Sequence, residues 1–242
     1  MSAARIRLDP LEITGRARTH VVQIDDPRFA AQPAVVAAFM DLGRAAAGAG
    51  FDLLPLSAFR DFKAQLRIWN RKFLGQTPLF DRSGRPRDFS SLTPSQIMWA
   101  ILRWTALPGA SRHHWGTEID VVDAAATLGG YAPQRLPQEV GPGGPYHGLH
   151  LWLDDNLARF GFFRPYADDR GGMHPEPWHL SHAETSGQAL TALRPDLLQE
   201  VVERSAICGK DLVLAALPEI IERHVLNFSP PLELRTQPPN AP

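Results

Sequence analysis

The 242-residue chain contains very little cysteine, because Cys208 is the only one. A single thiol excludes an intrachain disulfide and also excludes any zinc site built from clustered cysteines. The hydrophobic content of 44% is enough for an ordinary core. A chain of this length therefore has no need of disulfides to fold, and one domain or one domain with a small appendage is expected.

Long apolar runs and long basic runs are missing as well. The formal net charge is −1, and lysine and arginine are scattered along the chain. A clustered basic face is what phosphate-dominated binding requires, so we expect no nucleic-acid partner. No stretch approaches the roughly 18 apolar residues of a membrane span. The first twenty residues lack the apolar centre of a signal peptide, so we expect a cytoplasmic protein, or a periplasmic or extracellular one if another export route is used.

Helix and strand patterns follow one another without the regular alternation of a parallel α/β protein. This arrangement predicts an α+β fold with a small, mainly antiparallel sheet flanked by helices. The helices are expected at 33–48, 62–74, 94–105 and 147–160, and the strands at 51–59, 117–123, 161–166 and 177–182. Polar loops rich in glycine and proline are expected at 75–92 and 128–145.

The chain is expected to divide into two parts. Residues 1–185 contain the histidine-rich segments and form the predicted catalytic domain. Residues 186–242 carry apolar residues at helical spacing and end in a proline-rich tail. We expect this second part to be a helical extension that supplies no metal ligand. The oligomeric state is left open.

Histidines gather in two short segments. Residues 111–120 read SRHHWGTEID, and residues 174–179 read HPEPWH. A catalytic zinc needs three protein ligands drawn from imidazole and carboxylate groups, with one position left open for water. His113, Asp120 and His179 supply such a set. We therefore expect one Zn²⁺ per chain at these three residues.

A carboxylate beside the proposed ligands can serve as the general base. Glu176 precedes His179 by three residues and is the candidate. In an ideal strand the two side chains would point to opposite faces. Pro177 lies between them and disfavours regular pairing, so we expect a kink that turns both inward. In the earlier strand, Asp120 can face the site while its neighbour Ile119 packs inside.

Three spaced blocks carry a resemblance to a known family. They are S-x-F-R-x-x-x-x-Q at 57–65, S-x-H-x-x-G-x-x-x-D at 111–120, and E-P-W-H at 176–179. In this order they resemble the zinc D-Ala-D-Ala carboxypeptidases of the vancomycin-resistance type. That family belongs to a wider group with the lysostaphin-type endopeptidases and the hedgehog domain. The resemblance covers roughly residues 35–182.

The resemblance implies roles for individual residues. It makes His113, Asp120 and His179 the zinc ligands, and Glu176 the base. It also makes Arg60 the arginine that holds the substrate and stabilises the oxyanion, a task that suits a guanidinium group.

Other polar residues near these blocks receive different expectations. Ser111 and Gln65 match positions that help bind the substrate's terminal peptide or carboxylate. Glu118 departs from the small residue usual in the family, and we expect a structural acid rather than a fourth ligand. His174 is expected not to bind the metal. His147 and His150 lie three apart and are expected on a solvated helix face.

The function implied is a zinc peptidase acting on peptidoglycan stem peptides or D-Ala-terminated dipeptides, with D-alanyl-D-alanine carboxypeptidase activity favoured. A peptidoglycan endopeptidase with the same zinc chemistry is the nearest alternative. A non-catalytic zinc module that recognises a partner is the other. Glu176 favours an enzyme, since a purely structural site needs no base.

Overall fold

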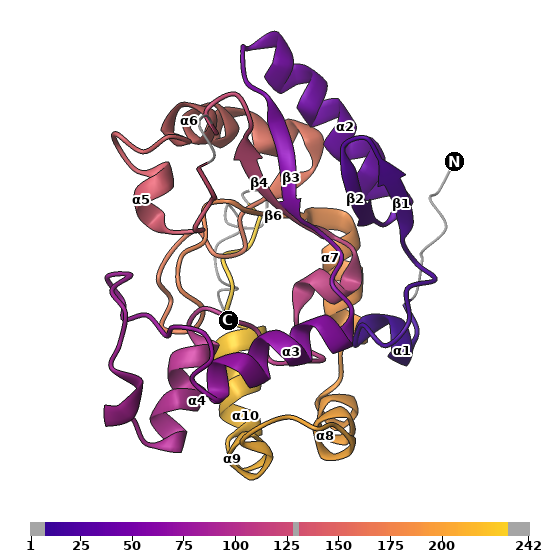
Figure 1. The fold of residues 1–242 in the computed structure, drawn as a ribbon. Helices are drawn as coiled ribbons and strands as arrows, with labels where there is room; N and C mark the ends of the chain where they lie inside the picture. Colours follow the sequence, from indigo (N-terminus) through magenta and orange to yellow (C-terminus); the bar gives the residue numbers. More distant parts are fainter. Residues whose placement is uncertain (1–7, 128–130, 232–242) are drawn as a thin grey trace, which may run out of the picture.

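The computed structural model describes residues 8–127 and 131–231 (Figure 1). The α-helices are α1 (Pro10–Ile13), α2 (Pro33–Gly48), α3 (Phe62–Phe73), α4 (Pro94–Leu102), α5 (Pro137–Val140), α6 (His147–Asn156), α7 (Ala183–Ala192), α8 (Pro195–Arg204), α9 (Lys210–Ala215) and α10 (Leu217–Ile220). The strands are β1 (Val22–Asp25), β2 (Arg28–Ala31), β3 (Leu53–Ser57), β4 (Glu118–Asp123), β5 (Phe162–Phe163) and β6 (His179–His182). Three 3₁₀ turns, η1 (Phe89–Ser91), η2 (Arg112–Trp115) and η3 (Leu157–Phe160), and one π-helical turn, η4 (Ile221–Val225), complete the described elements.

The central sheet of the described chain has four antiparallel strands in the order β3-β4-β6-β5. The hairpin β1-β2 forms a separate pair. Within the central sheet, Asp120 of β4 lies opposite His179 of β6. This register brings together two side chains that are 59 positions apart in sequence. The predicted α+β class with a small antiparallel sheet is confirmed.

One core lies between the sheet and α2. Ile119 and Val121 point from β4 into this core, where they join Val35 and Phe39 of α2. Because side chains alternate along a strand, Asp120 between them faces the other side. The predicted alternation of β4 is therefore confirmed, and it leaves the opposite face of the sheet for polar residues.

The helices that border the site begin where their capping residues predict. The side chain of Asp61 accepts a hydrogen bond from the Ala64 backbone and caps α3. At α4, Thr93 and Gln96 form a reciprocal capping box. Both caps satisfy backbone N–H groups that the first turn of a helix leaves free. In the view of Figure 1, α3 and α4 lie below the strands of the central sheet.

The C-terminal segment is helical, as predicted, but it shares a core with the preceding part of the chain. Helices α8 and α9 and residues 217–225 pack against α4 through a common apolar cluster. Helix α7 spans the expected boundary at 185/186, so that boundary falls inside a helix. Residues 232–242 of the proline-rich tail lie outside the described part of the chain. Among the residues described, no helix is both long and apolar enough to cross a membrane.

Candidate metal centre and active site

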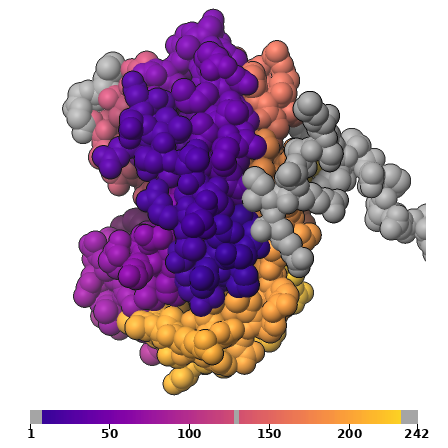
Figure 2. Space-filling model, turned by 90° about the vertical axis from the view of Figure 1, so that its right-hand side faces the viewer, coloured from indigo at the N-terminus to yellow at the C-terminus, as the bar shows by residue number. Residues whose placement is uncertain are grey.

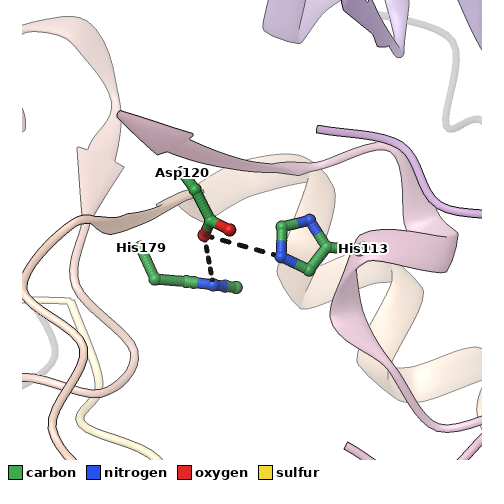
Figure 3. Close-up of side chains that lie close together, drawn as sticks. All are labelled: His113, Asp120 and His179. Atoms are coloured by element: carbon green, nitrogen blue, oxygen red, sulfur yellow. Dashed lines mark ion pairs between the residues drawn. The ribbon is translucent and has the colours of Figure 1, made fainter. Parts of the chain in front are cut away.

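Three side chains from separate elements meet at one point (Figure 3). His113 comes from the turn η2, Asp120 from β4 and His179 from β6. One ligand atom from each lies within 4.8 Å of the others. Oδ1 of Asp120 is 3.0 Å from Nδ1 of His179 and 3.5 Å from Nε2 of His113. The three residues predicted from the sequence to bind the metal are therefore close together in the fold.

The turn that carries His113 depends on a glycine. Gly116 ends η2 with a φ of 66°, in the left-handed region that favours glycine. A Cβ at this position would lie 2.4 Å from Cγ1 of Val21, which no real side chain tolerates. Gly116 thus lets the chain pass tightly from the His113 turn into β4, where Asp120 follows four residues later.

Each histidine has one ring nitrogen held by a neighbouring oxygen. Nδ1 of His113 donates to the carbonyl of Ala58 at 2.8 Å. Nε2 of His179 donates to Oε2 of Glu118 at 2.8 Å. These bonds fix the tautomers and leave Nε2 of His113 and Nδ1 of His179 with free lone pairs. Both free nitrogens face Asp120.

The donor set and its unsatisfied atoms fit a metal ion. Oδ1 of Asp120 and Nδ1 of His179 are buried and have no hydrogen-bond partner among the described residues. Buried polar atoms rarely stay unpaired, and here two of them are directed to one point. Two imidazoles and one carboxylate are the ligand types of a catalytic zinc site. The residues present therefore suit Zn²⁺.

Glu176 lies beside this cluster in the loop before β6. Its Oε2 is 3.6 Å from Nδ1 of His179, and its backbone N–H donates to the carbonyl of Tyr166. The backbone N–H of His179 donates to the carbonyl of Glu176, which closes a turn at Pro177. The predicted kink is confirmed. Burial raises the pKa of Glu176 to about 7, within the range useful for a general base.

Arg60 is positioned by a set of neutral oxygens. Its guanidinium donates to Oε1 of Gln65 at 3.0 Å and to Oγ of Ser57 at 2.9 Å. The ring of His114 holds the Arg60 carbonyl through Nδ1 at 2.6 Å, and its Nε2 accepts from the Gly109 backbone at 3.1 Å. Because the guanidinium of Arg60 makes these hydrogen bonds to neutral groups and not to a carboxylate, its positive charge is available to a ligand.

Gln65 is completely buried, and both ends of its amide are in use. Oε1 accepts from Arg60, while Nε2 donates to the carbonyl of Ala106 at 2.7 Å. In the structure Gln65 therefore orients Arg60. Direct substrate contact by Gln65 stays a prediction. Ser111, which lines the cavity in front of the metal cluster, has the placement that such contact requires.

A cavity of about 560 Å³ opens in front of these residues. The surface of the molecule is indented at the left edge of Figure 2, between its upper part and a lower purple segment. Five cationic side chains line the cavity, namely Arg60, Arg71, Lys72, Arg112 and Arg135. Two carboxylates, Asp120 and Glu176, line it as well. The cavity is therefore suited to a ligand that carries negative charge.

Two of these cations are functional candidates that sequence reasoning missed. Burial lowers the pKa of Lys72 to about 8, and its amine donates to the hydroxyl of Thr105. Lys72 follows Gln65 by seven residues on α3, so helical periodicity could have placed both on one face. Arg135 lies in a loop of little local pattern, and nothing in the sequence marks it.

Two histidines outside the cluster, His174 and His150, differ in their surroundings. His174 is buried and stacks on Trp104 with ring centroids 4.1 Å apart, and it is absent from the group that can hold a metal. That His174 does not bind the metal stays a prediction. The predicted solvated face of α6 is wrong for His150, which is 5% exposed and receives a hydrogen bond from Arg164 at 3.2 Å. Its burial follows from packing of α6 that helix periodicity alone does not reveal.

Two histidines and an aspartate with an adjacent glutamate, on a small antiparallel sheet, are the arrangement of a metallopeptidase site. Residues 29–185 match the VanY D-alanyl-D-alanine carboxypeptidase family. The chain belongs to this family of peptidases. The blocks at 57–65, 111–120 and 176–179 all lie within the matched residues.

Individual proteins are similar to parts of this chain. A protein of Haemophilus influenzae described as uncharacterized is 40% identical over 105 residues, which are 42% of this chain and 72% of the relative. A D-alanyl-D-alanine carboxypeptidase of Enterococcus faecalis is 32% identical over 94 residues, which are 37% of this chain and 29% of that protein. The solved structure of VanYB in complex with D-alanine-D-alanine has 20% identity and a TM-score of 0.51, covering 76% of this chain and 89% of that one. This last likeness supports the α+β fold.

Proposed function

We propose that this protein is a zinc-dependent carboxypeptidase that removes a terminal D-alanine from peptidoglycan stem peptides. The observation that carries the proposal is the convergence of His113, Asp120 and His179 with Glu176 beside them. Membership of the VanY family and the similarity to a D-alanyl-D-alanine carboxypeptidase support the same substrate class.

Each residue of the site has a separate role in peptide hydrolysis. His113, Asp120 and His179 would hold zinc, which polarises a scissile carbonyl and lowers the pKa of water. Glu176 accepts the proton of the attacking water at its carboxylate and returns it to the leaving amine. Arg60, held by Gln65 and Ser57, directs its guanidinium into the cavity, where it stabilises the developing oxyanion.

The cations of the cavity favour a carboxypeptidase over an endopeptidase. An exopeptidase must hold a terminal carboxylate near the scissile bond. Nη1 of Arg135 is 3.8 Å from Oδ2 of Asp120, so this guanidinium reaches the metal cluster from the loop 131–136. Arg135 has a φ of 55°, and among the described residues it is the one residue other than glycine with a positive φ. Such strain persists where surrounding structure imposes it, often at ligand sites. We assign Arg135 to the terminal carboxylate.

Defined substrates test the proposal. The protein, loaded with one equivalent of zinc, is incubated with a stem pentapeptide, and the products are identified by mass spectrometry. We expect loss of one D-alanine and a tetrapeptide product. Cleavage at an internal bond only would make the protein an endopeptidase. Zinc binding without hydrolysis of any peptide would favour the non-catalytic module.

A further inference from the structure

The guanidinium of Arg112 lies over two aromatic rings. Its Cζ is 4.8 Å from the centroid of the Trp115 ring and 5.1 Å from the centroid of the Phe228 ring. Trp115 belongs to η2, the turn that also carries His113, whereas Phe228 belongs to the segment that follows η4. The face of an aromatic ring attracts a cation within about 6 Å. Rings from two distant parts of the sequence therefore stabilise the charge of Arg112.

Burial makes these ring contacts matter. Arg112 is 4% exposed, so its charge has lost nearly all of its hydration. Nη2 donates to Oγ of Ser181 at 2.7 Å and lies 3.2 Å from Oε1 of Glu118. Nε and Nη1 are buried and have no hydrogen-bond partner among the described residues. A desolvated cation gains more from an aromatic face than an exposed one does. The two rings thus supply stabilisation that these two nitrogens do not obtain from hydrogen bonds.

A chain of contacts leads from Arg112 to a proposed zinc ligand. Arg112 pairs with Oε1 of Glu118, and Oε2 of the same carboxylate accepts from Nε2 of His179 at 2.8 Å. The other ring nitrogen of His179, Nδ1, is 3.0 Å from Oδ1 of Asp120. A carboxylate that accepts from a ligating imidazole orients the ring and raises its basicity. The ring of Phe228 is therefore connected to the geometry of His179 through two side chains.

The backbone around Phe228 is fixed by hydrogen bonds to the loop that follows β5. The side chain of Asn227 donates to the carbonyl of Arg170 at 2.8 Å and accepts from Nε of Arg170 at 2.9 Å. The backbone N–H of Ser229 donates to the carbonyl of Pro165 at 2.7 Å, and Ser229 is completely buried. Phe228 thus lies in a segment that is held on both of its sides. A side chain that positions another one needs such an anchor.

The same loop makes a close backbone contact with the C-terminal segment. A Cβ at Gly172 would lie 1.8 Å from the carbonyl oxygen of Arg223, so glycine is required there. Nη2 of Arg223 donates to the carbonyl of Gly171 at 3.2 Å. The C-terminal segment is therefore packed along the loop that leads to Glu176.

We propose that Phe228 is a positioning residue of the metal centre. Its ring stabilises Arg112 beside Glu118, and Glu118 holds His179 in the orientation that binds the metal. The inference rests on the zinc site of the proposed function. It gives the C-terminal extension, which lies beyond the family match at 29–185, a part in metal affinity without a ligand of its own.

Zinc affinity, measured by competition with a chromogenic chelator, tests the inference independently of hydrolysis. Phe228→Leu keeps an apolar side chain and removes the ring. It should weaken zinc binding about fivefold, less than the roughly 10–100-fold that a direct partner of a ligating histidine contributes. Phe228→Tyr retains an aromatic face and should restore wild-type affinity.

Two further proteins separate the electrostatic effect of the ring from its packing. Pentafluorophenylalanine in place of Phe228 keeps nearly the same shape but reverses the charge distribution of the ring face, so it should also weaken zinc binding. The control Phe51→Leu removes another half-buried ring, which packs on Trp152 with centroids 6.2 Å apart. It should bind zinc like wild type. Circular dichroism verifies that each protein is folded.

A double-mutant cycle shows whether Phe228 acts through Glu118. In the Glu118→Gln protein the carboxylate that pairs with Arg112 is gone, so Phe228→Leu should cause little additional loss of zinc affinity. An equal loss in both backgrounds would mean that the ring acts by another route, and would overturn the inference. Wild-type affinity in the protein with the fluorinated ring would overturn it as well.

The hydrolysis of a stem pentapeptide is measured separately. A wild-type protein that binds zinc but hydrolyses no peptide refutes the proposed function, and the zinc affinities of the Phe228 variants still decide the role of this residue. A wild-type protein that binds no zinc overturns both.

Discussion

Glu118 accepts a hydrogen bond from Nε2 of His179 at 2.8 Å, from the strand next to its own. Glu118 is completely buried, and its other oxygen accepts from Ser181 at 2.9 Å and lies 3.2 Å from Arg112. The guanidinium of Arg112 and the hydrogen bond from His179 outweigh burial and lower the pKa of Glu118 to about 2. The carboxylate is thus a charged, fixed partner that orients the imidazole of a proposed ligand.

Replacing Glu118 with glutamine should weaken zinc binding while leaving all three ligands in place. Partners of ligating histidines typically contribute about 10–100-fold to metal affinity, so we expect a loss in that range. Competition with a chromogenic chelator measures it. Glu184→Gln, at an exposed position on α7, is the matched control. Wild-type affinity in Glu118→Gln would show that this carboxylate does not tune the site.

The same substitution should also destabilise the fold. Arg112 is 4% exposed, and Glu118 is the carboxylate it pairs with. Removing one partner of a buried ion pair typically costs about 3–5 kcal/mol, because the other charge stays buried. Urea unfolding of the metal-free protein should reveal this loss. Equal stability of the two proteins would mean that water reaches Arg112.

The features that the sequence predicted are those with short-range causes. Alternation along β4 separates Asp120 from Ile119, and Asp61 begins α3 through its own side chain. The metal cluster was predictable because its residues are chemically distinctive and fall in recognisable blocks. Those blocks can be identified from their residues and order alone, without knowing how the strands pair.

Other parts of the site depend on contacts that no local pattern encodes. Glu118 meets His179 only because β4 and β6 pair antiparallel in one register. Arg135 reaches Asp120 through the path of a loop. His150 was expected in solvent and is buried by tertiary packing of α6. In each case the partner belongs to another element or loop, so the local sequence around the side chain does not reveal its surroundings.

Glu176→Gln separates the base from the ligands. Glutamine keeps the size of the side chain but cannot accept the proton, so turnover should fall by at least about 10²–10⁴-fold. Zinc content, measured by atomic absorption, should remain near one per chain. Hydrolysis of a stem pentapeptide at the wild-type rate would remove Glu176 from the mechanism.

The ligand variants should behave in the opposite way. His113→Ala or His179→Ala removes one of the three groups that can hold the metal. We expect zinc content and activity to be lost together, because the two remaining ligands are too few to hold a catalytic zinc. His174→Ala is the control, since His174 stacks on Trp104 outside the cluster. A His113→Ala protein with full zinc content would contradict the assigned ligand set.

Arg135→Gln should reduce the preference for substrates with a free terminal carboxylate. Wild-type protein should hydrolyse a peptide acid in preference to the corresponding C-terminal amide, because only the acid can pair with the guanidinium. In the variant, KM for the acid should rise about tenfold, whereas values for the amide should change little. The side chain is 47% exposed, so the substitution should not unfold the protein. If activity on the peptide acid and on the amide falls equally in the variant, Arg135 does not bind the terminal carboxylate.

His150 should make the protein sensitive to acid. Burial, reinforced by the nearby charge of Arg164, lowers the pKa of His150 to about 3 in the folded state, against about 6.5 in the unfolded chain. The unfolded state therefore binds a proton first as the pH falls. The stability that depends on the neutral ring is present above pH 6.5 and is lost progressively from there down to about pH 3.

Between pH 7 and pH 5 this single group should remove about 2 kcal/mol from the free energy of unfolding, since each pKa unit corresponds to about 1.4 kcal/mol. His150→Gln lacks a titrating ring at the same position. Its stability should therefore fall less than that of wild type over this range, even though its stability at pH 7 is lower. Urea unfolding of both proteins at the two pH values measures the difference, and effects of other groups cancel in the comparison. Parallel losses in the two proteins would mean that His150 takes up its proton in the folded state, and that the buried ring of α6 is accessible to water.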